Sequence, residues 1–169
     1  MAAITLEPVS TQSQIDTLCA IAKTVWHETY DDLLPPGQPD YMIEKFQSDH
    51  AVKEQMAREN YRYVLAKLGE AYVGFVGYAP RYQGQEEMYL SKAYILPQGR
   101  GQGVVGALFR LVEEETKKEG LSRVRLTVNK GNAHAKAVYE HYGYRTVEAV
   151  QSDIGRGYVM DDYVMVKEL

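Results

Sequence analysis

Hydrophobic positions in the first third of the chain repeat with two different periods. Apolar and polar residues alternate over residues 3–10, which predicts a short strand, and then recur at helical spacing through about His27. Three prolines and a glycine in residues 31–40 predict a loop. Residues 39–60 are typical of a second helical stretch, which we expect to break near Ser48 because a serine and an aspartate there can cap a fresh turn.

The middle of the chain is dominated by the period of strands. Two alternating runs in residues 61–80 are rich in β-branched and aromatic residues and flank Gly69-Glu70, which predicts a hairpin. A third run, residues 86–96, predicts another strand. A glycine-rich stretch follows, and Val104–Glu119 then shows helical spacing, with Gly120 as its natural C-terminal stop.

The last third continues with a predicted strand over residues 121–129 and a helix over residues 132–142 that Gly143 ends. Two closing strands are predicted over residues 144–150 and 158–169. The order is β-α-α-β-β-β-α-β-α-β-β, with no internal repeat, linker or low-complexity segment. One mixed sheet flanked by helices is the simplest fold that buries the apolar faces of these elements.

The composition is that of a soluble globular protein and narrows its partners. The 169 residues, 45% hydrophobic and 25% charged, fit one domain. A formal net charge of −4 without a lysine or arginine run argues against a nucleic-acid partner. The single cysteine, Cys19, lies among apolar residues at helical spacing, which predicts a buried thiol and suits a reducing cytosol. Because no signal-peptide pattern and no window near the ~20 apolar residues of a membrane span is found, we expect a cytoplasmic protein.

Four glycines fall within eight positions before the third predicted helix. Gly101, Gly103 and Gly106 spell G-x-G-x-x-G, the dinucleotide fingerprint, which belongs in the first turn of a βαβ unit with an acidic residue about 20 positions later. Here the motif follows an antiparallel meander, and the next strand ends in Asn129 and Lys130 without a carboxylate. These features argue against a nicotinamide or flavin cofactor.

The glycine stretch nevertheless has the physical character of an anion site. Glycines let the backbone approach a ligand closely, and the free N–H groups of a helix N-terminus point outward with positive potential. Arg100 stands beside these glycines. The stretch therefore predicts a phosphate-bearing ligand other than a dinucleotide.

This stretch resembles the acyl-CoA pyrophosphate loop of the GNAT superfamily of N-acetyltransferases, written R/Q-x-x-G-x-G/A. Aligned without a gap on the preceding strand, Arg100 and Gly103 match, and Val105 stands where the family usually has Gly or Ala. A second register, residues 98–103, satisfies the pattern fully but shortens the connection from the strand. We prefer the gapless register, because the apolar residues 107–109 then fall where the family's helix is apolar.

A second resemblance lies downstream, in the family's segment N-x-x-A-x-x-x-Y-x-x-x-G-F/Y. This chain fills that pattern with Asn132, Ala135, Tyr139, Gly143 and Tyr144. The residues themselves agree, since Asn132 is a good helix N-cap and Gly143 a good helix stop. The two motifs occur in the family's order, and together they cover about residues 87–150.

The resemblance implies a GNAT-like acyl-CoA N-acyltransferase fold over residues 1–169: a single mixed, mostly antiparallel sheet with helices on both faces. It implies acetyl-CoA as the acyl donor and direct attack by an amine on the thioester. The backbone N–H of Ile95 would stabilise the oxyanion, and Tyr139 would be the general acid for the leaving thiolate. The residues implied to bind the cofactor are Ala93, Tyr94, Ile95, Arg100, Gly101, Gln102, Gly103, Val104, Val105, Gly106, Asn132 and Tyr139.

The sequence does not identify a general base. The family often places a glutamate on the strand before the loop, and this chain has Tyr89 there. Glu87 and Ser91 lie two residues to either side on the same face. Any of the three can order a water that relays a proton, and a dedicated base can also be absent.

The acceptor site is expected to be built from the first helix, the proline-rich loop and the hairpin. At the end of that helix, carboxylates stand beside aromatic residues. Glu28, Tyr30, Asp31 and Tyr89 are the candidate acceptor residues, although a solvent-exposed helix end explains the first three equally well. Residues 153–169, together with residues 90–103 and 26–36, resemble a bacterial subgroup that includes spermidine/spermine N-acetyltransferases. The acceptor implied is a primary amine of a small molecule, such as a polyamine, or of a peptide.

An alternative function stays open. A catalytically silent acyl-CoA-binding or sensory module would share the fold, and Val105 together with the missing strand glutamate favours it, whereas Tyr139 argues for catalysis. The four histidines are dispersed without ligand spacing, so no metal is expected. Homodimers are common in the resembling family, so the resemblance allows a homodimer.

Overall fold

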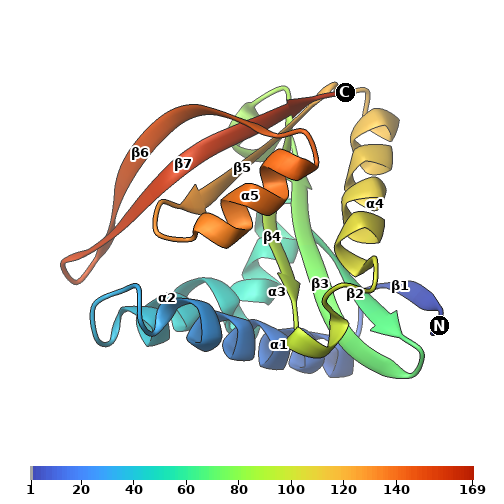
Figure 1. Ribbon diagram of the computed structural model, residues 1–169, viewed down its shortest axis with the longest axis horizontal. Helices are drawn as coiled ribbons and strands as arrows, with labels where there is room; N and C mark the ends of the chain where they lie inside the picture. The colour runs from blue at the N-terminus through green and yellow to red at the C-terminus, as the bar shows by residue number, and fades with distance from the viewer. Residues whose placement is uncertain (1) are drawn as a thin grey trace.

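The computed structural model describes residues 2–169, in which seven strands form one sheet (Figure 1). The strands are β1 (Ile4–Pro8), β2 (Arg62–Leu68), β3 (Ala71–Pro80), β4 (Met88–Ile95), β5 (Arg123–Asn129), β6 (Arg145–Gly155) and β7 (Tyr158–Glu168). Their order across the sheet is β1-β2-β3-β4-β5-β7-β6, and every neighbouring pair is antiparallel except β4 and β5. The predicted mixed, mostly antiparallel sheet is confirmed.

Five α-helices connect the strands, and each begins or ends near its sequence signal. They are α1 (Gln12–Tyr30), α2 (Gln38–Gln47), α3 (Asp49–Arg58), α4 (Val104–Lys118) and α5 (Ala133–His141), and short 3-10 turns span Tyr82–Gly84 and Pro97–Gly99. Thr11 and Gln14 form a reciprocal capping box at the start of α1. Ser48 caps α3, which confirms the expected break in the second helical stretch. In residues 2–169 no helix is both long and apolar enough to cross a bilayer.

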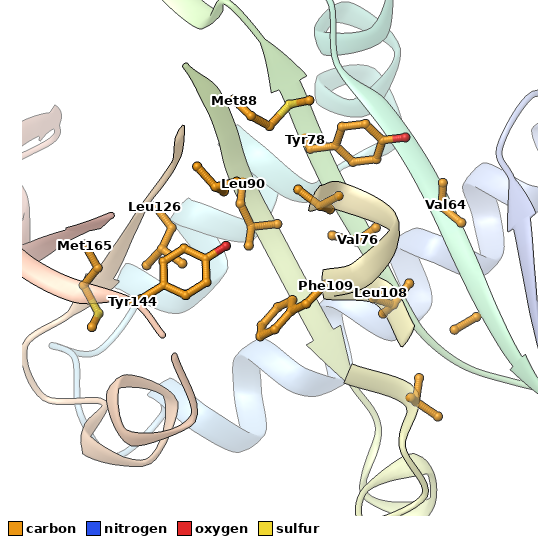
Figure 2. Packing of buried hydrophobic residues seen from close by; sticks show 14 of the residues in the cluster. Val64, Val76, Tyr78, Met88, Leu90, Leu108, Phe109, Leu126, Tyr144 and Met165 are labelled. Carbon is orange, nitrogen blue, oxygen red and sulfur yellow. The ribbon is translucent and has the colours of Figure 1, made fainter. Parts of the chain in front are cut away.

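The helices cover both faces of the sheet, as expected. On one face Leu18 of α1 and Val52 of α3 pack with Phe75 of β3 in a fully buried cluster. On the other face α4 contributes Leu108 and Phe109 to the larger core, which Figure 2 shows against the central strands. Both faces of the sheet are therefore covered around β3 and β4. Space for a ligand exists only where this packing is interrupted.

The interruption lies between β4 and β5. These strands pair only at Met88–Val124 and Tyr89–Arg125, and the rest of β4 has no strand beside it on that edge. The opposite edge of β4 pairs with β3 through a β-bulge at Ser91, because Gly77 pairs with Lys92 and the next residue of β3 pairs with Leu90. The centre of the sheet thus contains an open strand edge.

The long β6–β7 hairpin reaches around one end of the molecule to α2 (Figure 1). Tyr41 Oη and Lys45 Nζ donate hydrogen bonds of 2.5 and 2.7 Å to the carbonyl oxygen of Ile154, and Gln38 Nε2 donates one of 2.9 Å to that of Val159. These bonds hold α2 against the hairpin. Met160 of β7 packs there with Trp26 of α1 and Met42 of α2.

Candidate active site

A cavity of about 1340 Å³ opens at the unpaired edge of β4 and extends between α1–α3 and β7. Most of the predicted site residues line it: Glu28, Tyr30, Tyr89, Ala93, Tyr94, Ile95, Arg100, Gly101, Gly103, Val104, Val105, Asn132 and Tyr139. Gln102, Gly106 and Asp31 are not among the lining residues. Asp31 instead accepts a 2.8 Å contact from His27 one helical turn earlier. The structure thus gathers residues that span more than one hundred positions of sequence around one space.

The open edge of β4 presents backbone donors to the cavity. Leu96 N–H donates to the carbonyl oxygen of Val73 on β3 at 2.7 Å. Because successive N–H groups of a strand point to opposite edges, those of Ile95 and Ala93 point away from β3 and toward the cavity. An extended ligand can therefore pair with this edge as an added strand.

The start of α4 leaves backbone N–H groups without a helical partner. Its N-cap, Gly103, has a φ of +82° and no side chain caps the helix, and Gly101 before it has a φ of +72°. The first helical hydrogen bond runs from Ala107 N to Gly103 O at 3.1 Å, so the N–H groups of residues 104–106 have no helical partner. Left-handed backbone at both glycines and N–H groups without a helical partner are the features by which such a loop can bind an anion.

Val105 occupies the first turn of α4 and lines the cavity. Its side chain is partly buried against the larger core, whereas Val104 before it is 1% exposed. At Gly106 an added Cβ would lie 3.1 Å from Tyr142 Oη, so close packing of α5 accounts for that glycine. The branched side chain at the family's Gly/Ala position therefore forms part of the cavity wall.

Arg100 is already engaged by two acceptors. Its Nη2 lies 2.6 Å from Glu28 Oε1, and its Nε donates to the carbonyl oxygen of Ile95 at 3.2 Å. A predicted acceptor residue and a predicted cofactor residue are thus joined in one ion pair. Glu28 therefore lies beside the loop that precedes α4.

Tyr139 lies on α5 with its ring between the core and the cavity. The ring stacks on Phe109 at a centroid distance of 5.8 Å and meets Tyr144 edge-on at 5.8 Å. Burial raises the pKa of the Tyr139 phenol well above its ordinary value, and Tyr30 and Tyr89 raise it further. The phenol is therefore protonated at neutral pH.

Asn132 links the two sides of the cavity. Its Oδ1 accepts from Ala135 N at 3.1 Å, which confirms the predicted N-cap of α5, and its Nδ2 donates to Tyr30 Oη at 3.3 Å. Tyr30 packs on Trp26 of α1 at a centroid distance of 4.4 Å. Burial raises the pKa of Tyr30, while the bond from Asn132 lowers it. The end of α1 is thereby held beside α5.

Sequence reasoning missed a polar network behind β4. Trp26 Nε1 donates to Tyr94 Oη at 2.8 Å, and Gln47 Nε2 contacts the same oxygen at 3.3 Å. Gln47 is 3% exposed, and its Oε1 has no partner among the described residues. Tyr94 therefore presents its backbone to one side of the site and anchors α1 and α2 with its hydroxyl.

A buried lysine was also missed. Lys92 is 5% exposed, and its Nζ donates to Tyr63 Oη at 2.6 Å, Gln55 Oε1 at 2.9 Å and the carbonyl oxygen of Phe46 at 2.5 Å. Burial lowers the pKa of Lys92 to about 7. The signal in the sequence was a charge that alternates with Met88 and Leu90 along the strand, although the bulge at Ser91 turns Lys92 toward α2 and α3.

The third missed residue is Asp162 on β7, which lines the cavity and is 6% exposed. Burial and, to a smaller extent, the charge of Asp161 raise the pKa of Asp162 to about 6, against a lowering by Lys130. The signal was a charge at an inward position of an alternating run, between Met160 and Val164.

Other reactive side chains contribute little here. Burial raises the pKa of the Cys19 thiol to about 11, so this thiol is a weak nucleophile at neutral pH. Within residues 2–169 no three His, Cys, Asp or Glu side chains gather to hold a metal ion.

The family model described as the acetyltransferase (GNAT) family matches residues 25–144. This stretch contains the glycine-rich loop before α4 and helix α5, both of which line the cavity. The chain belongs to the GNAT family. The resemblance drawn from the two sequence motifs is confirmed.

Curated relatives of this GNAT protein are uncharacterized N-acetyltransferases of Mycobacterium bovis and Mycobacterium tuberculosis. They are 36% identical over 95 residues, which cover 56% of this chain and 60% of each relative. The aligned part of the GNAT chain therefore spans less than two thirds of the length of these relatives.

Solved structures share the whole fold of this GNAT protein. The PaiA N-acetyltransferase from Thermoplasma acidophilum, in complex with coenzyme A, has a TM-score of 0.80 at 18% identity, with 99% of both chains covered. A GCN5-related N-acetyltransferase from Rhodopseudomonas palustris has a TM-score of 0.81 at 16% identity, with 100% of this chain and 98% of that chain covered. At such identities the likeness shows the fold alone.

Proposed function

We propose that this protein transfers the acetyl group of acetyl-CoA to a primary amine of a small molecule or peptide. The observation that carries the proposal is the pairing of β4 with β5 at two positions only, beside the uncapped N-terminus of α4. That arrangement offers a strand edge for an extended arm and an anion site for its phosphates within one cavity.

The acyl donor, acetyl-CoA, would lie along the loop before α4 and the open edge of β4. The free N–H groups of residues 104–106 would hold the pyrophosphate, with Arg100 beside them. The pantetheine arm would pair with Ala93 and Ile95, whose N–H groups face the cavity. Coenzyme A in the Thermoplasma acidophilum neighbour supports an acyl-CoA ligand for this fold.

The chemistry follows from these positions. A neutral amine attacks the thioester carbonyl carbon, and the carbonyl oxygen becomes anionic in the tetrahedral intermediate. The N–H of Ile95 would stabilise that oxygen, an interaction worth roughly 3 kcal/mol for one such donor. As the C–S bond breaks, Tyr139 would protonate the leaving sulfur, since its phenol carries its proton at neutral pH.

The acceptor would enter the other end of the cavity, between α2, α3 and β7. Glu44, Glu54 and Glu59 line the cavity together with Lys45 and Lys92. Glu44 and Glu59 are exposed, whereas Glu54 is paired with Arg58 at 3.1 Å. The exposed carboxylates support a cationic acceptor such as a polyamine, because they attract amines of opposite charge.

Free-thiol release from acetyl-CoA over a panel of polyamines, amino acids and N-terminal peptides tests the proposal. We expect turnover of at least one amine and thermal stabilisation by acetyl-CoA and CoA. Stabilisation by acetyl-CoA without turnover of any amine would instead favour the silent acyl-CoA-binding module. Stabilisation by NAD alone would overturn both interpretations.

A further inference from the structure

We propose that the carboxylate of Asp162 binds the ammonium group of the acceptor and takes its proton before the amine attacks. This inference rests on the proposed function, because it assigns the general base of that same reaction. It names a residue outside both sequence motifs, on the strand at the far side of the cavity.

The strand register fixes where Asp162 points. It lies opposite Asn129 of β5, and both residues line the cavity. Met160, two residues earlier on the same face of β7, packs with Trp26 of α1 and Met42 of α2. The Asp162 side chain is therefore on the α1–α2 face of the sheet, where the acceptor would enter.

Asp162 is a buried carboxylate without a protein partner. In residues 2–169 its oxygens take part in no side-chain hydrogen bond or ion pair, although the residue is 6% exposed. The nearby Lys130 is paired with Asp161 at 2.9 Å. A buried charge is costly unless it is paired, so a ligand cation such as an ammonium group is the complement that this position lacks.

Asp162 also lies near the groups proposed for the reaction. Its charge raises the pKa of Tyr30, whose hydroxyl accepts from Asn132 at the start of α5. Tyr30 of α1 in turn raises the pKa of Tyr139, which lies on α5. The proposed proton acceptor and proton donor thus border one region of the cavity.

Two other carboxylates near β4, Glu87 and Glu28, are already engaged. Glu87, a sequence-derived candidate for water-mediated relay, does not line the cavity and faces Arg123 and Arg125 at 3.9 and 3.8 Å. Glu28 is bound to Arg100. Ser91 accepts a hydrogen bond from Tyr61 at 2.8 Å and has no charge to offer.

The raised pKa of Asp162, about 6, supports the role. The group is ionised at neutral pH, yet it is more basic than an ordinary aspartate and so accepts a proton more readily. The titratable groups that face it are Tyr30 from α1, Lys130 from the turn after β5 and Asp161 from its own strand.

The protons balance as follows. Asp162 takes one proton from R–NH3+, and the neutral amine forms the C–N bond to the acetyl carbon. When the C–S bond breaks, Tyr139 gives its proton to the sulfur and regains one from the nitrogen of the intermediate. The products are the N-acetylated amine and CoA-SH, and Asp162 releases its proton to solvent.

The test compares Asp162→Asn with Asp161→Asn, a matched loss of one charge at the neighbouring residue on the opposite face. The probes are acetyl-CoA with spermidine, putrescine and a glycine-initiated tripeptide. For the amine that the wild type uses best, we expect Asp162→Asn to lower kcat/KM about 100-fold or more, and Asp161→Asn to stay within about three-fold. Both variants should bind acetyl-CoA as the wild type does, and Asp162→Glu should recover part of the activity.

A pH profile separates a proton acceptor from a purely structural residue. Wild-type kcat/KM should fall as pH drops below about 6, and Asp162→Asn should lack that limb. Equal kcat/KM in the two asparagine variants, with the wild type active, would overturn the assignment and leave the proposed function standing. A wild type that neither binds acetyl-CoA nor acetylates any amine would overturn the proposed function, and the role of Asp162 with it.

Discussion

Arg100 Nη2 lies 2.6 Å from Glu28 Oε1, so the loop before α4 is tied to the end of α1 by an ion pair. Both side chains are partly exposed, at 46% and 38%. The carboxylate offsets the positive charge that the loop would present to a phosphate. A phosphate ligand at this loop would therefore compete with Glu28 for the guanidinium.

Glu28→Gln should bind acetyl-CoA more tightly than the wild type. Partly exposed ion pairs are worth about 0.2–1 kcal/mol, so the expected gain is up to about five-fold in Kd. Arg100→Gln should weaken binding, because the donor to phosphate is lost. Calorimetric titration with acetyl-CoA measures both, and weaker binding by Glu28→Gln would mean that the pair orders the loop for its ligand.

Tyr139→Phe should lower kcat by about 100-fold while leaving the Kd for acetyl-CoA nearly unchanged, since only the proton donor is removed. The ring stacking on Phe109 survives the substitution. Steady-state thiol release gives kcat, and titration gives Kd. Tyr142→Phe is the matched control, because Tyr142 also lines the cavity from the end of α5 and should lose little activity. Equal rates for Tyr139→Phe and the wild type would remove the acid role.

Asp162→Asn should stabilise the protein at pH 7. The unfolded chain releases this proton near pH 3.8 and the folded protein holds it to about pH 6. The folded state therefore binds more protons in that window, and the free energy of unfolding falls as pH rises through it. Removing the charge should add on the order of 1–3 kcal/mol at pH 7 and much less at pH 4.

Thermal unfolding at the two pH values measures this effect. A gain of that size corresponds to several degrees in Tm for a protein of this length. Asp161→Asn removes a carboxylate that is paired with Lys130 and is expected to give no such gain. Equal Tm shifts for Asp162→Asn at pH 4 and pH 7 would contradict the raised pKa.

Gly101→Val should lower stability more than Gly101→Asn. The φ of +72° at Gly101 lies in the left-handed region, which asparagine adopts more readily than a β-branched residue, and no atom crowds an added Cβ there. The difference should be about 1 kcal/mol, or some 2–4 °C in Tm. Similar Tm values for the two variants would mean that the loop adjusts its backbone without cost.

Short sequence patterns predicted the helices and strands well, because helix caps and turns depend on residues that are close together in the sequence. The capping box at Thr11, the serine cap at Ser48 and the Asn132 cap all form as the residue types indicate. The helix α1 runs past the expected end at His27 to Tyr30, since the prolines that stop it come later. Strand β6 likewise extends to Gly155, because it is held by its partner β7 more than by its own apolar pattern.

What the sequence could not give depends on contacts between distant residues. The β4 and β5 strands are parallel, so the glycine loop does lie in a βαβ unit. The absent carboxylate was therefore a stronger argument against a dinucleotide ligand than the position of the loop along the chain. The pair of Glu28 with Arg100 joins residues 72 positions apart. Asp162 was visible as a charge at an inward position, but only the fold shows that its face borders the cavity.

An unpaired strand edge is usually a hazard, because it offers a template on which another chain can assemble. In this protein the open edge of β4 lies inside the molecule, between helices on both faces. If the cofactor completes the sheet there, heat resistance will rise with the logarithm of its concentration above Kd. Cofactor supply would then govern how long the protein survives in the cell as well as how fast it works.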